Sequence, residues 1–218
     1  MTGDKMEQPD FCRLYMEAPE GYRAELIGGI VFEPPPPGYD HGSNDSSLIS
    51  LLAMFSGLTD GVDGVSAVSV VLGGQDQVEP DCILRIESDF GGKSRIGKKH
   101  RKSGVRLLEG APELVAEVAH TSRAIDLHLK KDRYKLAGVI EYVVLCIKPL
   151  ELYWFLLQED RNLEIGADGI YRSKVFPGLW IDRDALLKRD YKKSMLALNA
   201  GMDSVEYHTF ADLLRARK

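Results

Sequence analysis

The chain of 218 residues is 44% hydrophobic and 28% charged, which is typical of a soluble globular protein of one domain with additions. Its net charge of -5 at pH 7 gives no overall sign of nucleic-acid binding. No apolar run reaches the roughly 18 residues that a membrane span needs, and the N-terminus "MTGDKMEQPD" is too polar for a signal peptide, so we expect a cytoplasmic protein with no membrane partner.

The three cysteines fit this location. Cys12, Cys82 and Cys146 are widely spaced and show no CxxC pattern, which predicts reduced thiols rather than disulfides.

The N-terminal part of the chain predicts a helix, a hairpin, a second helix and two strands. A short helix over 9–18 precedes a hairpin over 22–36, which turns at Gly28-Gly29 and ends in prolines. Polar capping residues and apolar residues three and four apart predict an amphipathic helix over 41–58. Strands over 64–74 and 78–87 follow, separated by a Gly-Gly turn and a short polar link.

The stretch from Lys93 to Arg106 is strongly basic, with seven Lys or Arg residues and no acid. A solvated loop is the usual interpretation of such a run. The second interpretation is a loop that binds a phosphate backbone. The residues that would then contact nucleic acid are Lys93, Arg95, Lys98, Lys99, Arg101 and Lys102.

The C-terminal part predicts a strand over 113–119 and then a helix over 122–139. This helix has an apolar stripe of Ile125, Leu129 and Leu136, and Gly138 lies at its C-terminal stop. Buried strands over 140–147 and 150–158 follow, then a strand edge and a last helix within 171–190, with weaker order toward Lys218. The order predicts an α/β or α+β domain with a mixed sheet. No GxGxxG or GxxxxGK loop indicates a nucleotide cofactor.

Glu117 lies in the middle of the apolar run "ELVAEVAH". A buried carboxylate costs several kcal/mol, or has a pKa raised by as much as ~3–5 units, unless a cation or hydrogen bonds satisfy it. Alternatively, Glu117 lies on the solvent face of a one-sided strand. Asp81 follows Pro80 at the start of another apolar strand. If these strands are neighbours, the two carboxylates converge as ligands for a hard divalent cation such as Mg²⁺.

The helix after Glu117 carries Asp126, Lys130, Tyr134 and Gly138 at intervals of four, so they share one face. One interpretation is an exposed Asp126–Lys130 pair that contributes a few tenths of a kcal/mol. In the other, the lysine faces inward beside the acidic pair, where it stabilises phosphate charge or orients a water molecule.

Five stretches in this order resemble a known family. They are "YRAELIGGIV", "PPPPGYDHG", "PDCILRI", "GAPELVAEVAHTSRAIDLHLKKDRYKLAGVIEYVV" and "VFPGLW". The chain is similar, from about residue 10 to about 190, to the Uma-type (Uma-two) putative restriction endonuclease family of the PD-(D/E)xK nuclease superfamily. The resemblance implies a restriction-endonuclease-like fold, a mixed β-sheet flanked by helices. We expect one domain over 1–218 with a C-terminal extension over about 191–218.

The resemblance also implies roles for individual residues. Asp81 and Glu117 match metal ligands, for Mg²⁺ or Mn²⁺. The superfamily lysine usually stands two residues after the acid, where this chain has Ala119, and the family position for it is Lys130. His120 replaces the serine of many members and could tune or occupy the metal site. The residues with supporting roles are Glu25, His41, His120, Asp126 and Tyr134.

The predicted function is a metal-dependent endonuclease that hydrolyses DNA phosphodiester bonds, with Asp81, Glu117 and Lys130 as catalytic residues. DNA is the expected partner, and fold-level analogy makes a homodimer an expectation for an enzyme that cuts both strands. The alternative is a catalytically weak or inactive nucleic-acid-binding or regulatory module of the same fold, which His120 and the acidic net charge favour. A structural or protein-interaction domain would instead carry the acids at its surface.

Overall fold

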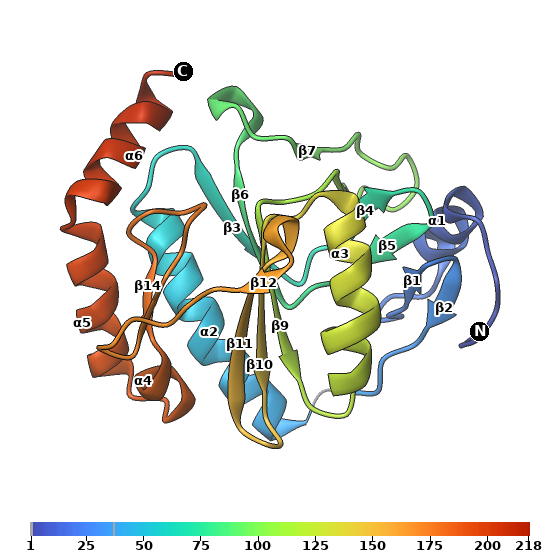
Figure 1. Ribbon diagram of the computed structural model, residues 1–218. Helices are drawn as coiled ribbons and strands as arrows, with labels where there is room; N and C mark the ends of the chain where they lie inside the picture. Colours follow the sequence, from blue (N-terminus) through green and yellow to red (C-terminus); the bar gives the residue numbers. More distant parts are fainter. Residues whose placement is uncertain (1, 37) are drawn as a thin grey trace.

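Two six-stranded mixed sheets and a two-stranded hairpin organise the computed structural model, which describes residues 2–36 and 38–218 (Figure 1). The first sheet has, in spatial order, β2 (Ile30–Phe32), β1 (Glu25–Ile27), β5 (Asp76–Val78), β4 (Val70–Gly73), β8 (Leu108–Glu109) and β7 (Arg95–Ile96). The second sheet has β12 (Arg161–Asn162), β11 (Glu151–Leu156), β10 (Glu141–Cys146), β9 (Leu114–Ala119), β6 (Cys82–Ile86) and β3 (Val62–Ser66). The hairpin pairs β13 (Ile170–Arg172) with β14 (Trp180–Asp182).

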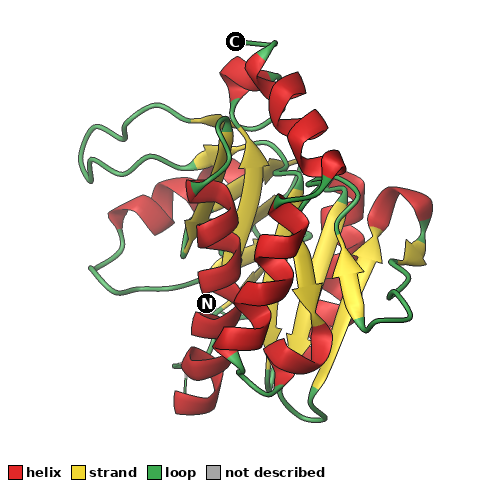
Figure 2. Cartoon of the chain, turned by 90° about the vertical axis from the view of Figure 1, so that its left-hand side faces the viewer, coloured by secondary structure: helices red, strands yellow, loops and turns green. Residues whose placement is uncertain are grey.

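Helices cover both faces of the second sheet, and α1 (Gln8–Glu17) packs against the first sheet. The others are α2 (Tyr39–Gly57), the π-helical turns η2 (Ile125–Lys130), α3 (Lys131–Ala137), α4 (Arg183–Leu187), α5 (Tyr191–Met202) and α6 (Val205–Arg215), with short 3₁₀ turns η1 (Ser88–Phe90) and η3 (Leu157–Glu159). Figures 1 and 2 show α2 and the C-terminal helices on one face, and Figure 1 shows α3 on the other. Within the described part of the chain, no helix is long and apolar enough to cross a membrane.

The central strand β9 is buried at every residue because both of its faces are covered. Leu114, Ala116 and Val118 belong to the core cluster that α2 shares, whereas Val115 and Ala119 belong to the cluster on the α3 side. Parallel pairing with β10 gives the near-continuous apolar sequence of such a strand. The interpretation that Glu117 lies on a solvent face is therefore wrong.

The predicted hairpin over 22–36 is confirmed, because β1 and β2 pair across Gly28 and Gly29. These two glycines have φ angles of 59° and 77°, the backbone that a two-residue turn between twisted strands requires. A turn also forms near the predicted Gly73-Gly74 pair, but it consists of Gly74 and Gln75, because Gly73 ends β4 and pairs with Asp76 of β5.

The strands predicted over 64–74 and 78–87 are each divided between the two sheets. β3 lies in the second sheet and β4 in the first, with Ala67 between them at a φ of 50°. Likewise β5 lies in the first sheet and β6 in the second, and the chain changes sheet at Pro80, which has no N–H to donate to a ladder. Residues Glu79 to Asp81 are thereby placed where the two sheets meet.

The expectation of a single last helix and of weak order toward Lys218 was wrong. Three capped helices, α4, α5 and α6, follow β14, and the side chains of Asp182, Asp190 and Ser204 accept hydrogen bonds from their first-turn backbone N–H groups. Leu198 and Leu214 are buried in the same core cluster as β9 and α2. Helices α5 and α6 therefore contribute residues to the main core.

We expect Leu198→Ala to lower the free energy of unfolding by about 2–5 kcal/mol, because it leaves a cavity in that core. Urea denaturation measures the change. Leu196, on the same helix and 62% exposed, is the matched control, and Leu196→Ala should change stability by less than about 0.5 kcal/mol. Equal effects of the two substitutions would contradict a core role for α5.

Candidate functional site

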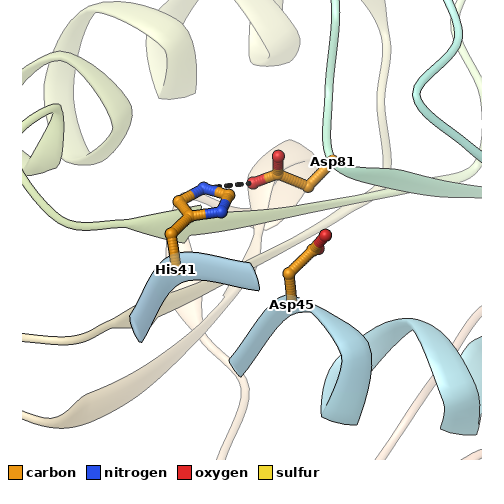
Figure 3. A group of neighbouring side chains, drawn as sticks. All are labelled: His41, Asp45 and Asp81. Atoms are coloured by element: carbon orange, nitrogen blue, oxygen red, sulfur yellow. Dashed lines mark ion pairs between the residues drawn. The ribbon is translucent and has the colours of Figure 1, made fainter. Parts of the chain in front are cut away.

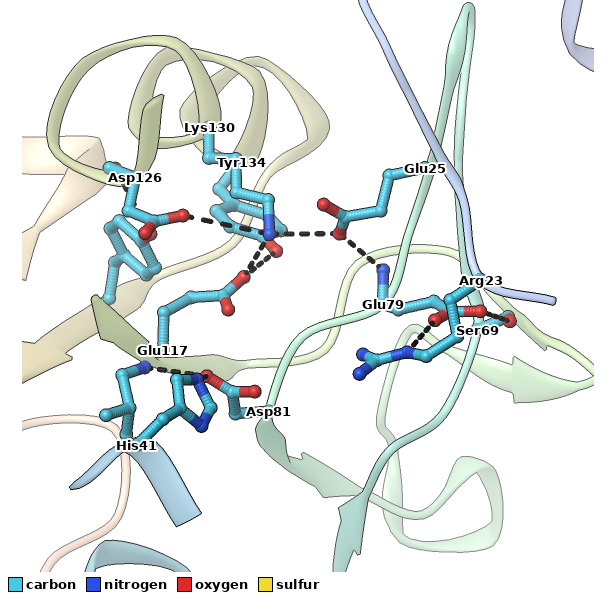
Figure 4. Close-up of polar contacts among 12 residues, drawn as sticks. Arg23, Glu25, His41, Ser69, Glu79, Asp81, Glu117, Asp126, Lys130 and Tyr134 are labelled. Carbon is cyan, nitrogen blue, oxygen red and sulfur yellow. Dashed lines mark hydrogen bonds and ion pairs between the residues drawn. The ribbon is translucent and has the colours of Figure 1, made fainter. Parts of the chain in front are cut away.

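Asp81 and Glu117 come from neighbouring strands of the second sheet. β6 pairs with β9 in antiparallel register with Cys82 opposite Ala116, so one further step sets Asp81 opposite Glu117. The Asp81 carboxylate also accepts a hydrogen bond of 2.7 Å from the backbone N–H of Val118. The two strands are thus neighbours, as predicted, and their acids lie at the same end of β9 (Figure 4).

Lys130 lies at the centre of a buried polar cluster (Figure 4). Its Nζ is 2.9 Å from both Glu117 Oε1 and Glu25 Oε1, and 3.8 Å from Asp126 Oδ1. Tyr134 donates a hydrogen bond of 2.8 Å from its hydroxyl to Glu117 Oε1. Lys130 is only 5% exposed and Asp126 only 2%, so the interpretation of an exposed i,i+4 pair is wrong.

Two of the three residues of the predicted apolar stripe do not face the core. Leu129 is 36% exposed and Leu136 is 74% exposed, whereas Ile125 is partly buried against the core. The inward face is instead the polar one, with Asp126, Lys130 and Tyr134. Charged groups can occupy it because each has an opposite charge or a hydrogen-bond donor within reach. Gly138 ends α3 with a φ of 98°, as predicted.

The charges of this cluster do not balance. Burial raises the pKa of Glu117 well above its ordinary value, although the Lys130 ammonium opposes this rise. Burial would lower the pKa of Lys130, but Glu117, Glu25 and Asp126 together raise it well above its usual range. Lys130 keeps its proton because three carboxylates surround it. One ammonium for three carboxylates leaves excess negative charge.

A cavity of about 240 Å³ opens beside the cluster, and further acidic residues that line it add to the excess negative charge. Among the described lining residues, the two cationic side chains are those of Arg23 and Lys130. The carboxylates that line it are Glu25, Glu33, Glu79, Asp81, Glu117 and Asp126. Six acids against two such cations make an environment that favours cation binding.

A second group of ligand atoms meets at Asp81. One ligand atom each of His41, Asp45 and Asp81 lies within 4.8 Å of the others, and His41 Nε2 is 3.6 Å from Asp81 Oδ2 (Figure 3). The hydrogen bond with Asp81 raises the pKa of His41. Burial, followed by the charge of Asp81, raises the pKa of Asp45 to about 6.

These donors fit a divalent metal ion. Asp45 Oδ1 and Asp126 Oδ2 are buried and have no hydrogen-bond partner among the described residues, although such atoms are normally satisfied. Sequence reasoning missed Asp45. It stands four residues after His41 on the predicted helix over 41–58, and that spacing, which puts both side chains on one face, was the signal that could have found it.

The remaining predicted residues are His120 and the six basic residues, and they lie outside the buried cluster around Lys130. His120 is exposed at the cavity and is not in the group of converging ligand atoms. None of the six basic residues between Lys93 and Lys102 is among the described residues that line the cavity. Arg95 is paired with Glu109 and Lys102 with Glu17. In Figure 1, β7 lies at the top while the C-terminal end of β9 points to the bottom, so the basic stretch is separate from the acidic site.

The family of the chain follows from a direct comparison. The family model Uma2, described as putative restriction endonuclease, matches residues 8–184. The chain belongs to the Uma2 family. This confirms the family predicted from the sequence, and the match contains every residue of the polar cluster and of the cavity. No curated protein matches the chain.

The fold of this Uma2 protein is shared with a solved structure. A putative nuclease belonging to DUF820 from Anabaena variabilis matches with a TM-score of 0.55 and 13% sequence identity, over 74% of this chain and 87% of that chain. At this identity the likeness shows the fold. The predicted restriction-endonuclease-like architecture, mixed sheets flanked by helices, is thereby confirmed. Family and fold are those of putative nucleases.

Proposed function

We propose that this Uma2 protein is a metal-dependent endonuclease that hydrolyses DNA phosphodiester bonds. The observation that carries the proposal is the buried Glu117–Lys130 pair, which lies beside Asp81 at an acidic cavity. A buried ion pair is a costly way to stabilise a fold, so its position at a cavity favours a chemical role.

The acids are the proposed ligands of Mg²⁺ or Mn²⁺. Asp81 and Glu117 would hold the ion, and His41 and Asp45 offer further donors close to Asp81. Oxygen ligands suit Mg²⁺, and the imidazole makes Mn²⁺ the second ion to test. A divalent ion bound here supplies positive charge for the scissile phosphate and lowers the pKa of water.

The residues of the chain have separate tasks in this proposal. Lys130 places an ammonium group next to Glu117, where it stabilises negative charge that develops on the phosphate. Tyr134 fixes the orientation of the Glu117 carboxylate through its hydroxyl, and the Val118 N–H does the same for Asp81. The burial of Glu117 and Lys130 keeps water from screening their charges.

The basic residues Lys93, Arg95, Lys98, Lys99, Arg101 and Lys102 are proposed to contact the DNA backbone outside the cavity, and a homodimer would bring two sites to one duplex.

Cleavage is tested with supercoiled plasmid and labelled single-stranded DNA and RNA, in Mg²⁺, Mn²⁺ or EDTA. We expect nicking of DNA in either metal and none in EDTA. DNA binding without cleavage under all conditions would favour the non-catalytic module. Cleavage of RNA alone would support metal-dependent phosphodiester hydrolysis but would show that the substrate is RNA and not DNA.

Metal binding should also be detectable by thermal unfolding, a measurement that does not depend on cleavage. We expect Mg²⁺ or Mn²⁺ to raise the melting temperature of the wild type, since an ion at 100 times its Kd stabilises the folded state by about 2.7 kcal/mol. Asp81→Asn should remove this shift, because Asp81 belongs to the group of converging ligand atoms with His41 and Asp45 and is also the proposed ligand beside Glu117. Asp160→Asn, at an 80% exposed carboxylate paired with Lys135, is the control and should keep it. A full shift in Asp81→Asn would contradict the site.

A further inference from the structure

Arg23 stands at the entrance to β1 and faces the acidic cavity. In extended chain, side chains alternate between two sides. Arg23, Glu25 and Ile27 line the cavity, whereas Ala24 and Leu26 are buried in the core cluster that α1 shares. The same alternation that brings Glu25 to Lys130 therefore brings Arg23 to the cavity.

Among the residues that the structure describes, Glu79 holds the Arg23 guanidinium at one of its three nitrogens. Its Nε donates a hydrogen bond of 3.1 Å to Glu79 Oε2. Glu79 is itself fixed, because its other oxygen accepts hydrogen bonds from Ser69 Oγ at 3.1 Å and from the Tyr15 hydroxyl. In Figure 4 the terminal nitrogens of Arg23 point away from Glu79 toward the side of Asp81.

Arg23 is the cation of this cavity that a ligand reaches most easily. Its side chain is 45% exposed, whereas that of Lys130 is 6% exposed and is surrounded by three carboxylates. Burial lowers the pKa of Arg23, but the hydrogen bond and charge of Glu79 outweigh this and raise it, so the charge is permanent. The charges of Asp81 and Glu25 also act on Arg23, which places it in the field of the proposed catalytic acids.

We propose that Arg23 binds a non-bridging oxygen of a backbone phosphate through its terminal guanidinium nitrogens, with Glu79 as the positioning residue. The inference rests on the proposed function and extends it to how the substrate is held. A guanidinium presents a planar fork of N–H donors that matches phosphate, and anchoring through Nε leaves that fork available. Because a phosphate contact reads no base, Arg23 contributes affinity and position but not sequence specificity.

The test is binding of a fluorescein-labelled DNA duplex by anisotropy, with Ca²⁺ present and at salt concentrations from about 50 to about 200 mM. Loss of one phosphate contact reduces the slope of log Kd against log salt by about 1. We expect this change in Arg23→Ala, with affinity weakened about tenfold or more at the lowest salt. The matched control is Arg183→Ala, at an exposed arginine paired with Asp184, which should change neither quantity.

Two milder variants distinguish a direct phosphate contact of Arg23 from a structural role in the fold. Arg23→Lys keeps the charge and loses the fork, so the salt slope should stay while affinity falls. Glu79→Gln should likewise keep the slope and weaken binding, because Arg23 remains charged but is less well positioned. A purely structural role of Arg23 would lower the melting temperature without changing the salt slope, and that result would overturn the inference.

Failure of the inference is distinguishable from failure of the proposed function. If the wild type binds the duplex with a clear salt dependence and Arg23→Ala has the same slope, the assignment of Arg23 is wrong and the nuclease proposal stands. An equal loss of slope in Arg183→Ala also overturns it. If the folded wild type does not bind DNA at all, the proposed function fails and the assignment of Arg23 fails with it.

Discussion

Glu117→Gln is expected to lower the metal-dependent cleavage rate by about 10³-fold. The amide keeps the size of the side chain and can still accept a hydrogen bond from Tyr134, but it loses the negative charge offered to a metal ion. A divalent ion contributes several kcal/mol of charge stabilisation, and each 1.36 kcal/mol corresponds to a factor of ten in rate. Plasmid nicking in Mg²⁺ and Mn²⁺ measures the effect. The fold should persist, because Glu25 and Asp126 remain next to the Lys130 ammonium.

Glu141 provides the matched control for this substitution. It is a fully buried glutamate on the adjacent strand β10, and it is not among the described residues that line the cavity. Its carboxylate accepts hydrogen bonds from Trp154, Ser173 and the backbone N–H groups of Lys174 and Val175. Glu141→Gln should therefore reduce stability but keep the cleavage rate at temperatures where the protein is folded. Full activity in Glu117→Gln would disprove a catalytic role for Glu117.

Lys130→Ala is expected to lower the free energy of unfolding by about 3–5 kcal/mol, besides removing activity. The substitution leaves Glu25, Glu117 and Asp126 buried without their cation, and an uncompensated buried charge costs this much. Chemical denaturation at neutral pH measures the loss. A divalent ion should restore part of it, because the acids that lose the ammonium gain a second source of positive charge.

Lys135→Ala on the same helix is the control for Lys130→Ala. Lys135 forms an exposed pair with Asp160, so its removal should cost no more than about 1 kcal/mol. The double variant Lys130→Ala/Glu117→Gln should be less destabilised than the sum of its single variants, since removal of one carboxylate reduces the unpaired charge. Additive effects would mean that Lys130 and Glu117 do not interact in the folded protein.

Much of the candidate site could be predicted from local spacing. Asp126, Lys130 and Tyr134 share a face because helical geometry is set by the backbone, and the structure brings them together around Glu117. Gly138 ends the helix because its φ of 98° is a conformation that glycine adopts without strain. The family, too, was predicted from five stretches of sequence, of which the residues between Glu117 and Tyr142 are the most specific, and the family comparison confirms it.

Other features depend on contacts between distant segments, which no local pattern contains. The division of 64–74 and of 78–87 between two sheets is set by which partner strands are available. The helix after Glu117 turns Leu129 and Leu136 to solvent because its polar face has counter-charges from β1 and β9, and these outweigh apolar burial.

The sequence by itself determined the hairpin over 22–36, the shared face of Asp126, Lys130 and Tyr134, and the family, since the first two depend on spacing within one segment. The tertiary structure decided that Asp45 joins His41 and Asp81, and that Arg23 faces the cavity while the basic stretch does not. The physical reason is that electrostatic interactions act through space. A charge's partners are fixed only when strands and helices from distant parts of the chain pack together.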